Sequence, residues 1–235
     1  MRILFSIWTG LILLCGSGYA PDSAYSQSYT IFIKGSAAGS ETVKETVSEN
    51  GDLVSDSEHE MLVTDGLETK SMSFATRMVF SGKPRSLVSY EYRYTSGGTG
   101  DAYSVSIRDA QAQRVLTRGG RTSEIRVPFT PDMVILDFNV YHQYDHVIRR
   151  YDLKRGGRQI FANFVPLIGN DIQLAITFQG DSDLKANGKS IRVRNFQVEF
   201  VGISSGTASM DKDGRLVRLV IPIQEIEVVR QDLLP

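Results

Sequence analysis

The chain has 235 residues, 41% of them hydrophobic, and a formal net charge of −1 at neutral pH. This balance excludes the strongly basic surface with which nucleic-acid-binding proteins attract phosphates, so we expect no nucleic-acid partner. Cys15 is the single cysteine. A chain that loses its first residues therefore has no thiol for catalysis or zinc binding.

The first residues have the pattern of an export signal. One positive charge, Arg2, precedes a short apolar run that ends at Leu14, and small residues follow up to Ala20. The run is too short to span a bilayer, which takes roughly 20 apolar residues. We expect a signal peptide over residues 1–20, no transmembrane segment in the mature chain, and a periplasmic or secreted protein.

Two details of this segment stay open. Cleavage after Ala20 would leave Pro21 just beyond the cut, which is unfavourable, and cleavage after Gly18 is the alternative. Lipid attachment through Cys15 fits less well, because Leu14 rather than a small residue precedes that cysteine.

The rest of the chain consists of short segments in which apolar and polar residues alternate. After a serine-rich start over 21–28, which we expect to be flexible, they recur through 29–233 and predict one β-rich domain. Asn-Gly and Asp-Gly pairs, as at 187–188 and 213–214, favour hairpin turns between them. About a dozen such strands are more than one flat sheet holds. We predict a mainly β fold with a strongly curved antiparallel sheet, a half-barrel or barrel-like.

Two consecutive strands carry an aromatic and methionine-rich face. One interpretation is ordinary core packing, and the alternative is the wall of a pocket for an apolar ligand. The pocket-wall candidates are Met72, Phe74, Met78, Phe80, Tyr90, Tyr92 and Tyr94.

One segment has helical spacing instead. Its apolar residues from Val140 to Tyr151 form a single stripe, and Asp137 or Asn139 could cap the start. We predict one central helix around 139–153 whose stripe packs against the concave face of the sheet.

A later strand changes phase. Ile191 and Val193 share one face, whereas Phe196 and Val198 share a face one residue out of step. An extra residue would restore the register, so we predict a β-bulge near Asn195.

His142 and His146 are weak candidates for metal ligands. Their spacing places both imidazoles on one face of the predicted helix, as a metal site requires. However, no glutamate follows His142 as in zinc proteases, and the pair falls opposite the apolar stripe. We expect two solvated or edge histidines and no cofactor.

The segment 202–206 matches the G-x-S-x-G pattern around a nucleophilic serine, here Ser204. That motif works only on a turn between a strand and a helix, and a further strand follows here. We interpret the segment as a bend between strands. Neither the histidine pair nor the G-x-S-x-G pattern has the context that catalysis needs. The sequence therefore favours a protein without enzymatic activity.

Three segments resemble uncharacterised secreted bacterial β-rich domains. They are residues 29–41, 137–152 and 213–219. These domains are similar to the curved half-barrel group that includes periplasmic lipoprotein carriers, in which a bent sheet wraps a helix around an apolar hollow. The resemblance implies a fold and a compartment, but no reaction and no functional residues.

These observations lead to one preferred function and two alternatives. The preferred one is a non-enzymatic exported protein that binds an apolar or amphiphilic ligand, such as a lipid, in the concave face of the sheet. The first alternative is a scaffold or assembly factor of the cell envelope with another envelope protein as its partner. The second is a metal-dependent or serine hydrolase.

Overall fold

The computed structural model describes residues 24–235 except 66–67, 83–84 and 98, so the predicted signal peptide lies outside the described residues. The described elements are β1 (Tyr25–Ile33), β2 (Ser36–Val47), β3 (Leu53–Asp65), β4 (Glu68–Ser81), β5 (Ser86–Ser96), β6 (Thr99–Arg108), β7 (Gln111–Arg118), β8 (Arg121–Pro128), α1 (Gln143–Ile148), β9 (Arg158–Val165), β10 (Asn170–Ala186), β11 (Lys189–Phe200), β12 (Ser204–Met210), β13 (Leu216–Ile221), η1 (Pro222–Gln224), β14 (Ile226–Arg230) and η2 (Gln231–Leu233).

All the strands belong to one 14-stranded sheet, in the order β8-β7-β6-β5-β4-β3-β2-β1-β14-β13-β12-β11-β10-β9. Strands that follow one another in the chain pair antiparallel, except β8 and β9, and the pairing of β1 with β14 joins the first half of the chain to the second. In the part of the chain that the structure describes, β8 and β9 are the two edges of this sheet.

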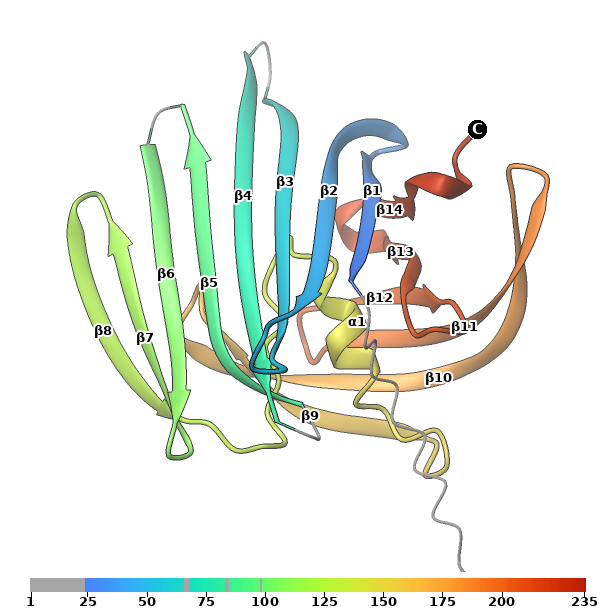
Figure 1. Ribbon diagram of the computed structural model, residues 1–235. Coiled ribbons are helices and arrows are strands. Elements are labelled where there is room, and N and C mark those ends of the chain that lie inside the picture. Colours follow the sequence, from blue (N-terminus) through green and yellow to red (C-terminus); the bar gives the residue numbers. More distant parts are fainter. Residues whose placement is uncertain (1–23, 66–67, 83–84, 98) are drawn as a thin grey trace, which may run out of the picture.

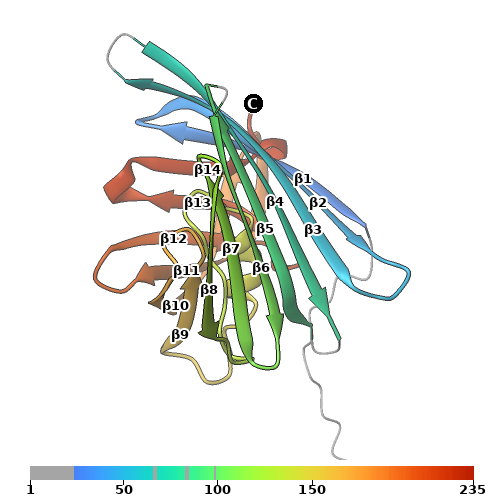
Figure 2. The same cartoon turned by 90° about the vertical axis from the view of Figure 1, so that its left-hand side faces the viewer.

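The sheet curls strongly on itself (Figure 1). Strands β9 and β10 run across the lower ends of β4–β8 in this view, and Figure 2 shows β9–β14 lying opposite the long strands of the first half. A hydrogen bond joins the two halves: the Arg114 guanidinium on β7 donates to the Pro166 carbonyl in the β9–β10 turn, at 2.8 Å. The predicted curved antiparallel sheet is confirmed.

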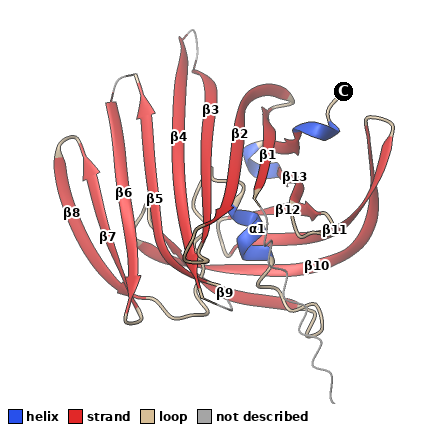
Figure 3. Cartoon of the chain, in the orientation of Figure 1, coloured by secondary structure: helices blue, strands red, loops and turns tan. Residues whose placement is uncertain are grey.

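The one α-helix of the described residues lies inside the curl (Figure 3), as predicted, but it covers only Gln143–Ile148 rather than 139–153. Asn139 has a φ of 61°, a left-handed conformation that no α-helix can contain. Among the described side chains, none caps the first turn at His142. The predicted caps, Asp137 and Asn139, are therefore wrong.

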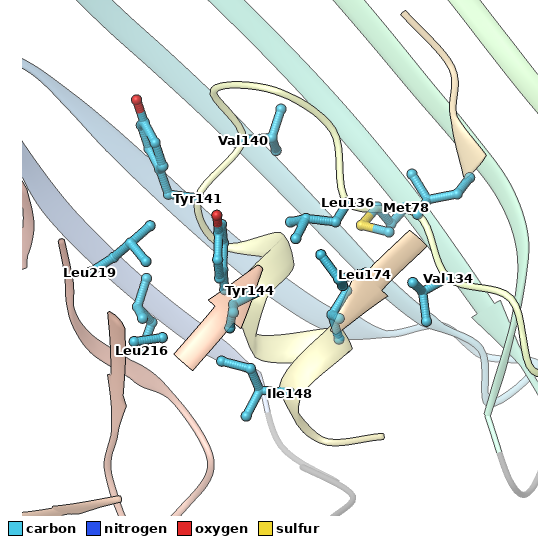
Figure 4. Close-up of a cluster of buried hydrophobic side chains, with 14 of the residues drawn as sticks. Met78, Val134, Leu136, Val140, Tyr141, Tyr144, Ile148, Leu174, Leu216 and Leu219 are labelled. Atoms are coloured by element: carbon cyan, nitrogen blue, oxygen red, sulfur yellow. The ribbon is translucent and has the colours of Figure 1, made fainter. Parts of the chain in front are cut away.

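The main hydrophobic core surrounds the helix (Figure 4). Tyr144 and Ile148 of α1 pack with Met78 of β4, Leu174 of β10 and Leu216 of β13, and all five are buried. Because each of these side chains is nearly fully removed from water, each stabilises the fold by about 1.5–3 kcal/mol. The apolar spacing seen in the sequence serves this core, although much of it lies in turns rather than in a helix.

A second, smaller core lies on the outer face of the sheet. Val193 of β11 and Val217 of β13 are buried there beneath Leu233 of η2. Phe196 of the same β11 belongs to the main core instead. The phase change in β11 therefore reflects a strand that buries different faces along its length.

A register shift nevertheless occurs where we predicted a bulge. Phe178 pairs with Phe196 and Gly180 pairs with Asn195, so the extra residue is Gln179 of β10. The pairing of β11 with β12 is regular through this region. The bulge lies opposite Asn195 rather than in its own strand.

The start of the sheet extends further than the sequence indicated. Strand β1 begins at Tyr25, inside the segment 21–28 that we expected to be flexible, and pairs there with Glu45 of β2. The Tyr25 ring is held under the Arg215 guanidinium, 3.7 Å from its centroid. Among the described residues, no helix combines the length and apolar character needed to cross a membrane.

Candidate functional site

The seven predicted pocket-wall residues all lie on the inner face of β4 and β5, which we call the aromatic face. Alternation along each strand places them there, and Phe74, Met78, Tyr90 and Tyr92 are buried. Met72, Phe80 and Tyr94 are only partly buried and pack around the edge of this core.

The rings of the aromatic face form a continuous layer that continues onto β6. Tyr92 stacks on Tyr103, with ring centroids 4.7 Å apart and planes 10° from parallel. Phe74 packs against Tyr94 at 5.2 Å. Offset and tilted aromatic pairs of this kind contribute about 0.5–1.5 kcal/mol beyond simple burial.

The aromatic face changes character towards the hairpin ends of β5–β7. Tyr94 is directly paired with Asp101, and Asp101 with Arg118. The Arg118 guanidinium donates to the Asp101 carboxylate at 2.6 Å, and its side chain is 59% exposed. An apolar surface thus ends at a solvated ion pair, and this end of β3–β8 projects beyond α1 in Figure 1.

Asp137 connects the aromatic face to the segment that precedes α1. Its carboxylate accepts hydrogen bonds from the hydroxyls of Tyr103 and Tyr90, and its backbone N–H donates to Gln143 Oε1 at 2.6 Å. Burial raises the pKa of Asp137 to about 6, although these hydroxyls oppose the shift. Asp137 thus ties the first residue of α1, Gln143, to the tyrosines of β5 and β6, which is a structural role.

A second buried polar group joins α1 to β2 and β3. The Glu41 carboxylate oxygen Oε1 lies 2.6 Å from His142 Nδ1 and 2.9 Å from His59 Nε2. Glu41 and His59 are directly paired across the β2–β3 ladder, and His142 is the residue just before α1. All three are at most 1% exposed. We call Glu41, His59 and His142 the histidine–carboxylate cluster.

A third polar group lies beside it and is centred on Arg215. The Arg215 guanidinium is 2.5 Å from Glu45 and 3.7 Å from Asp145, and all three residues are buried. We call these residues the Arg215 network. Burial raises the pKa of Asp145 to about 6 although Arg149 and Arg215 oppose it. Asp145 also forms an i,i+4 ion pair with Arg149, at 3.6 Å.

The expectation of two solvated or edge histidines is wrong. His142 is 1% exposed, and the side chain of His146 is 9% exposed and lies 3.3 Å from Glu45. Burial, followed by the charge of Arg149, holds the pKa of His146 well below its ordinary value. A helical wheel assumes one buried stripe, but α1 lies within a curled sheet that encloses it on more than one side.

The residues that lie beside these two histidines, Glu41, Glu45 and His59, were not predicted from the sequence. Glu41 and Glu45 share the inner face of β2 with Val43, and His59 shares the inner face of β3 with Met61. In each strand, the polar residue occupies the same alternating positions as its apolar neighbours. That pattern could have predicted that the side chain points into the core. Pairing it with a helix about 100 residues away required the fold.

Ser57 and Ser204 are the two serines to compare with the nucleophile of a serine hydrolase. Ser57 Oγ lies 3.2 Å from His59 Nε2, but the same nitrogen faces Glu41. A catalytic triad needs the serine and the acid on opposite nitrogens of the imidazole. Ser204 begins β12 directly after a turn, as a bend between strands predicts. Neither serine has the triad arrangement among the described residues.

Comparison with known proteins supports the fold alone. No family model matches the chain, and no curated protein matches it. A crystal structure of a beta-barrel-like protein of domain of unknown function DUF1849 from Brucella abortus aligns with a TM-score of 0.60 and 7% identity, over 87% of this chain and 93% of that one. A DUF1089 family protein from Pseudomonas aeruginosa aligns over 92% and 95% with 13% identity, but its TM-score of 0.46 supports no argument. The chain thus shares a β-rich, barrel-like architecture with a protein of unknown function.

Proposed function

We propose that the protein is an exported, non-enzymatic binding protein that holds an amphiphilic, lipid-like ligand against the open end of the aromatic face. The observation that supports this is the arrangement at the ends of β4–β7. Partly buried Met72, Tyr94 and Leu116 continue the buried aromatic layer outwards and stop at the Asp101–Arg118 ion pair.

The chemistry of that surface suits an amphiphile. An acyl chain laid along Met72 and Tyr94 would remove apolar surface from water, which is the main source of affinity for such ligands. The exposed Arg118 guanidinium lies at the same end and can donate hydrogen bonds to a carboxylate or phosphate headgroup.

A pair of adjacent substitutions tests this proposal. Met72→Asp places a charge on the inner face, whereas Ser73→Asp places the same charge on the exposed outer face of the same strand. Titration with a dansyl-labelled long-chain fatty acid should show binding by wild type and by S73D. For M72D we expect affinity to fall by roughly tenfold or more, the loss expected for one apolar contact of this size.

Two results would reject the proposal. One is a wild-type protein that binds no labelled fatty acid or lysophospholipid and carries no lipid in a denatured extract analysed by mass spectrometry. The other is equal binding by M72D and S73D, since the ligand would then lie elsewhere on the molecule.

Export is part of the proposal and rests on the N-terminal sequence. Arg2 followed by an apolar run and small residues up to Ala20 is typical of a cleaved signal peptide. Fusing residues 1–28 to alkaline phosphatase, which is active only outside the cytoplasm, should give active enzyme and a shortened chain. An inactive, full-length fusion would contradict export.

A further inference from the structure

All three histidines of the chain gather around α1. His59 and His142 both face Glu41, and the rings of His142 and His146 are 6.1 Å apart. His59 and His142 are more than 80 residues apart in the sequence. Ligand binding on the aromatic face does not account for their meeting at one carboxylate. The convergence of His59 and His142 on one buried carboxylate therefore needs a separate explanation.

The cluster has the composition and spacing of a metal site. One ligand atom each from Glu41, His59 and His142 lie within 4.8 Å of one another. Imidazole nitrogen and carboxylate oxygen are ligands that zinc binds at about 2.0–2.2 Å, and the His2Glu set is one of its established combinations. At such bond lengths, tetrahedral ligand atoms are about 3.4 Å apart. The Glu41–His59 and Glu41–His142 separations of 2.9 and 2.6 Å would therefore widen by about 0.5 and about 0.8 Å.

The scaffold holds these atoms firmly. Glu41 and His59 sit at directly paired positions in the middle of β2 and β3, so the sheet fixes their separation. His142 is fixed by a second hydrogen bond, because its backbone N–H also donates to Glu41 Oε1, at 3.2 Å. Rigid elements on both sides are what a preorganised metal site needs.

Hydrogen bonding within the cluster leaves three polar atoms without a partner in the described part of the chain. Glu41 Oε2, His59 Nδ1 and His142 Nε2 are buried and have no hydrogen-bond partner among the described residues. The second carboxylate oxygen is thus available to a cation, and Ser57 Oγ borders the same space, 3.2 Å from His59 Nε2.

The neighbouring cation does not compete for Glu41. The nearby guanidinium of Arg215 is paired with Glu45 and Asp145, so its charge is already balanced.

We propose that Glu41, His59 and His142 form a buried site for a late first-row divalent ion, best matched by Zn²⁺, that ties α1 to β2 and β3. The ion takes the place of the N–H protons that His59 Nε2 and His142 Nδ1 direct at Glu41 Oε1, and each imidazole then carries its proton on the opposite nitrogen, His59 Nδ1 and His142 Nε2. Because the ligands come from three segments, the ion links the start of α1 to the sheet from inside the curl. This site is independent of ligand binding on the aromatic face.

The test compares zinc binding by wild type with zinc binding by variants of each of the three histidines. Purified protein is unfolded in urea with a chelator, refolded with or without ZnCl₂, desalted, and analysed for bound zinc by mass spectrometry. We expect about one zinc ion per chain and a higher melting temperature for wild type with zinc. His59→Gln and His142→Gln should lose the ion, whereas His146→Gln, beside the site but outside it, should keep it.

X-ray absorption at the zinc edge keeps the proposal testable if a variant does not fold, because it needs only the wild-type protein. The expected spectrum shows two imidazole nitrogens and carboxylate oxygen around the ion. A wild-type protein that retains no zinc, an all-oxygen spectrum, or loss of zinc in H146Q equal to that in H59Q would each overturn the assignment. In the last case His146 would be a ligand as well.

Discussion

Replacing Arg215 with methionine should destabilise the fold strongly. Arg215 is 4% exposed and is the cation between Glu45 and Asp145, at 2.5 and 3.7 Å. Burial disfavours its charge, but Glu45 and Asp145 outweigh burial and raise the pKa of Arg215 above its ordinary value. Methionine conserves much of the side-chain volume, so the change removes mainly the charge.

The expected cost follows from what remains behind. Breaking a buried ion pair by removing one partner leaves an uncompensated buried charge and costs about 3–5 kcal/mol. Here Glu45 is 1% exposed and Asp145 is 3% exposed, so water cannot replace the guanidinium without opening the packing around α1. Arg215→Met should lower the free energy of unfolding by about that amount.

Urea unfolding followed by circular dichroism measures this difference, since the single tryptophan, Trp8, belongs to the predicted signal peptide. Arg218→Met is the matched control, because Arg218 pairs with Glu227 in an ion pair whose side chains are 42% and 38% exposed. That control should cost less than about 1 kcal/mol.

The double variant Arg215→Met/Glu45→Gln should recover a large part of the loss, since it removes one of the stranded charges. The reasoning would be refuted if R215M and R218M had the same unfolding free energy. It would also fail if the double variant were no more stable than R215M alone.

Three further predictions concern other parts of the fold. Burial raises the pKa of Asp137 from 3.8 to about 6, so the folded chain holds its proton more tightly than the unfolded chain. The resulting stabilisation is complete below pH 4 and lost as the pH rises to 6. The stability of wild type minus that of Asp137→Asn, from urea curves between pH 4 and 7, should fall by about 3 kcal/mol, and a flat difference would contradict the shift. Gly169→Ala should cost about 1–2 kcal/mol in the same assay, because its φ is +73° and its new Cβ would lie 2.8 Å from Ile125 Cδ1; an unchanged midpoint would show that the turn relaxes freely. Leu233→Asp should cost about 2–4 kcal/mol, because it uncovers the outer core around Val193, and a neutral result would mean that η2 does not protect that core.

The candidate site could be anticipated only in part. Helical spacing singled out His142 and His146, but the expected solvent exposure was wrong because a wheel drawn for one helix cannot show a sheet curling around it. Glu41 and His59 were not predicted. A single acid or histidine in an alternating strand looks like a surface residue unless its position is compared with the positions of its apolar neighbours.

Local physical rules were enough to determine the architecture of each segment. Period-two alternation fixes which side chains of β4 and β5 share a face, and Asn-Gly and Asp-Gly turns bring consecutive strands together, so an antiparallel curved sheet with one helix was predictable. What only the tertiary structure decided is how the two ends of the chain meet. The β1–β14 pairing and the curl bring β2, β3, α1 and β13 around a common interior, which places Glu41 beside His142 and Glu45 beside Arg215. Contacts between residues so distant in sequence depend on the sum of all strand twists and pairings, and no local pattern encodes that sum.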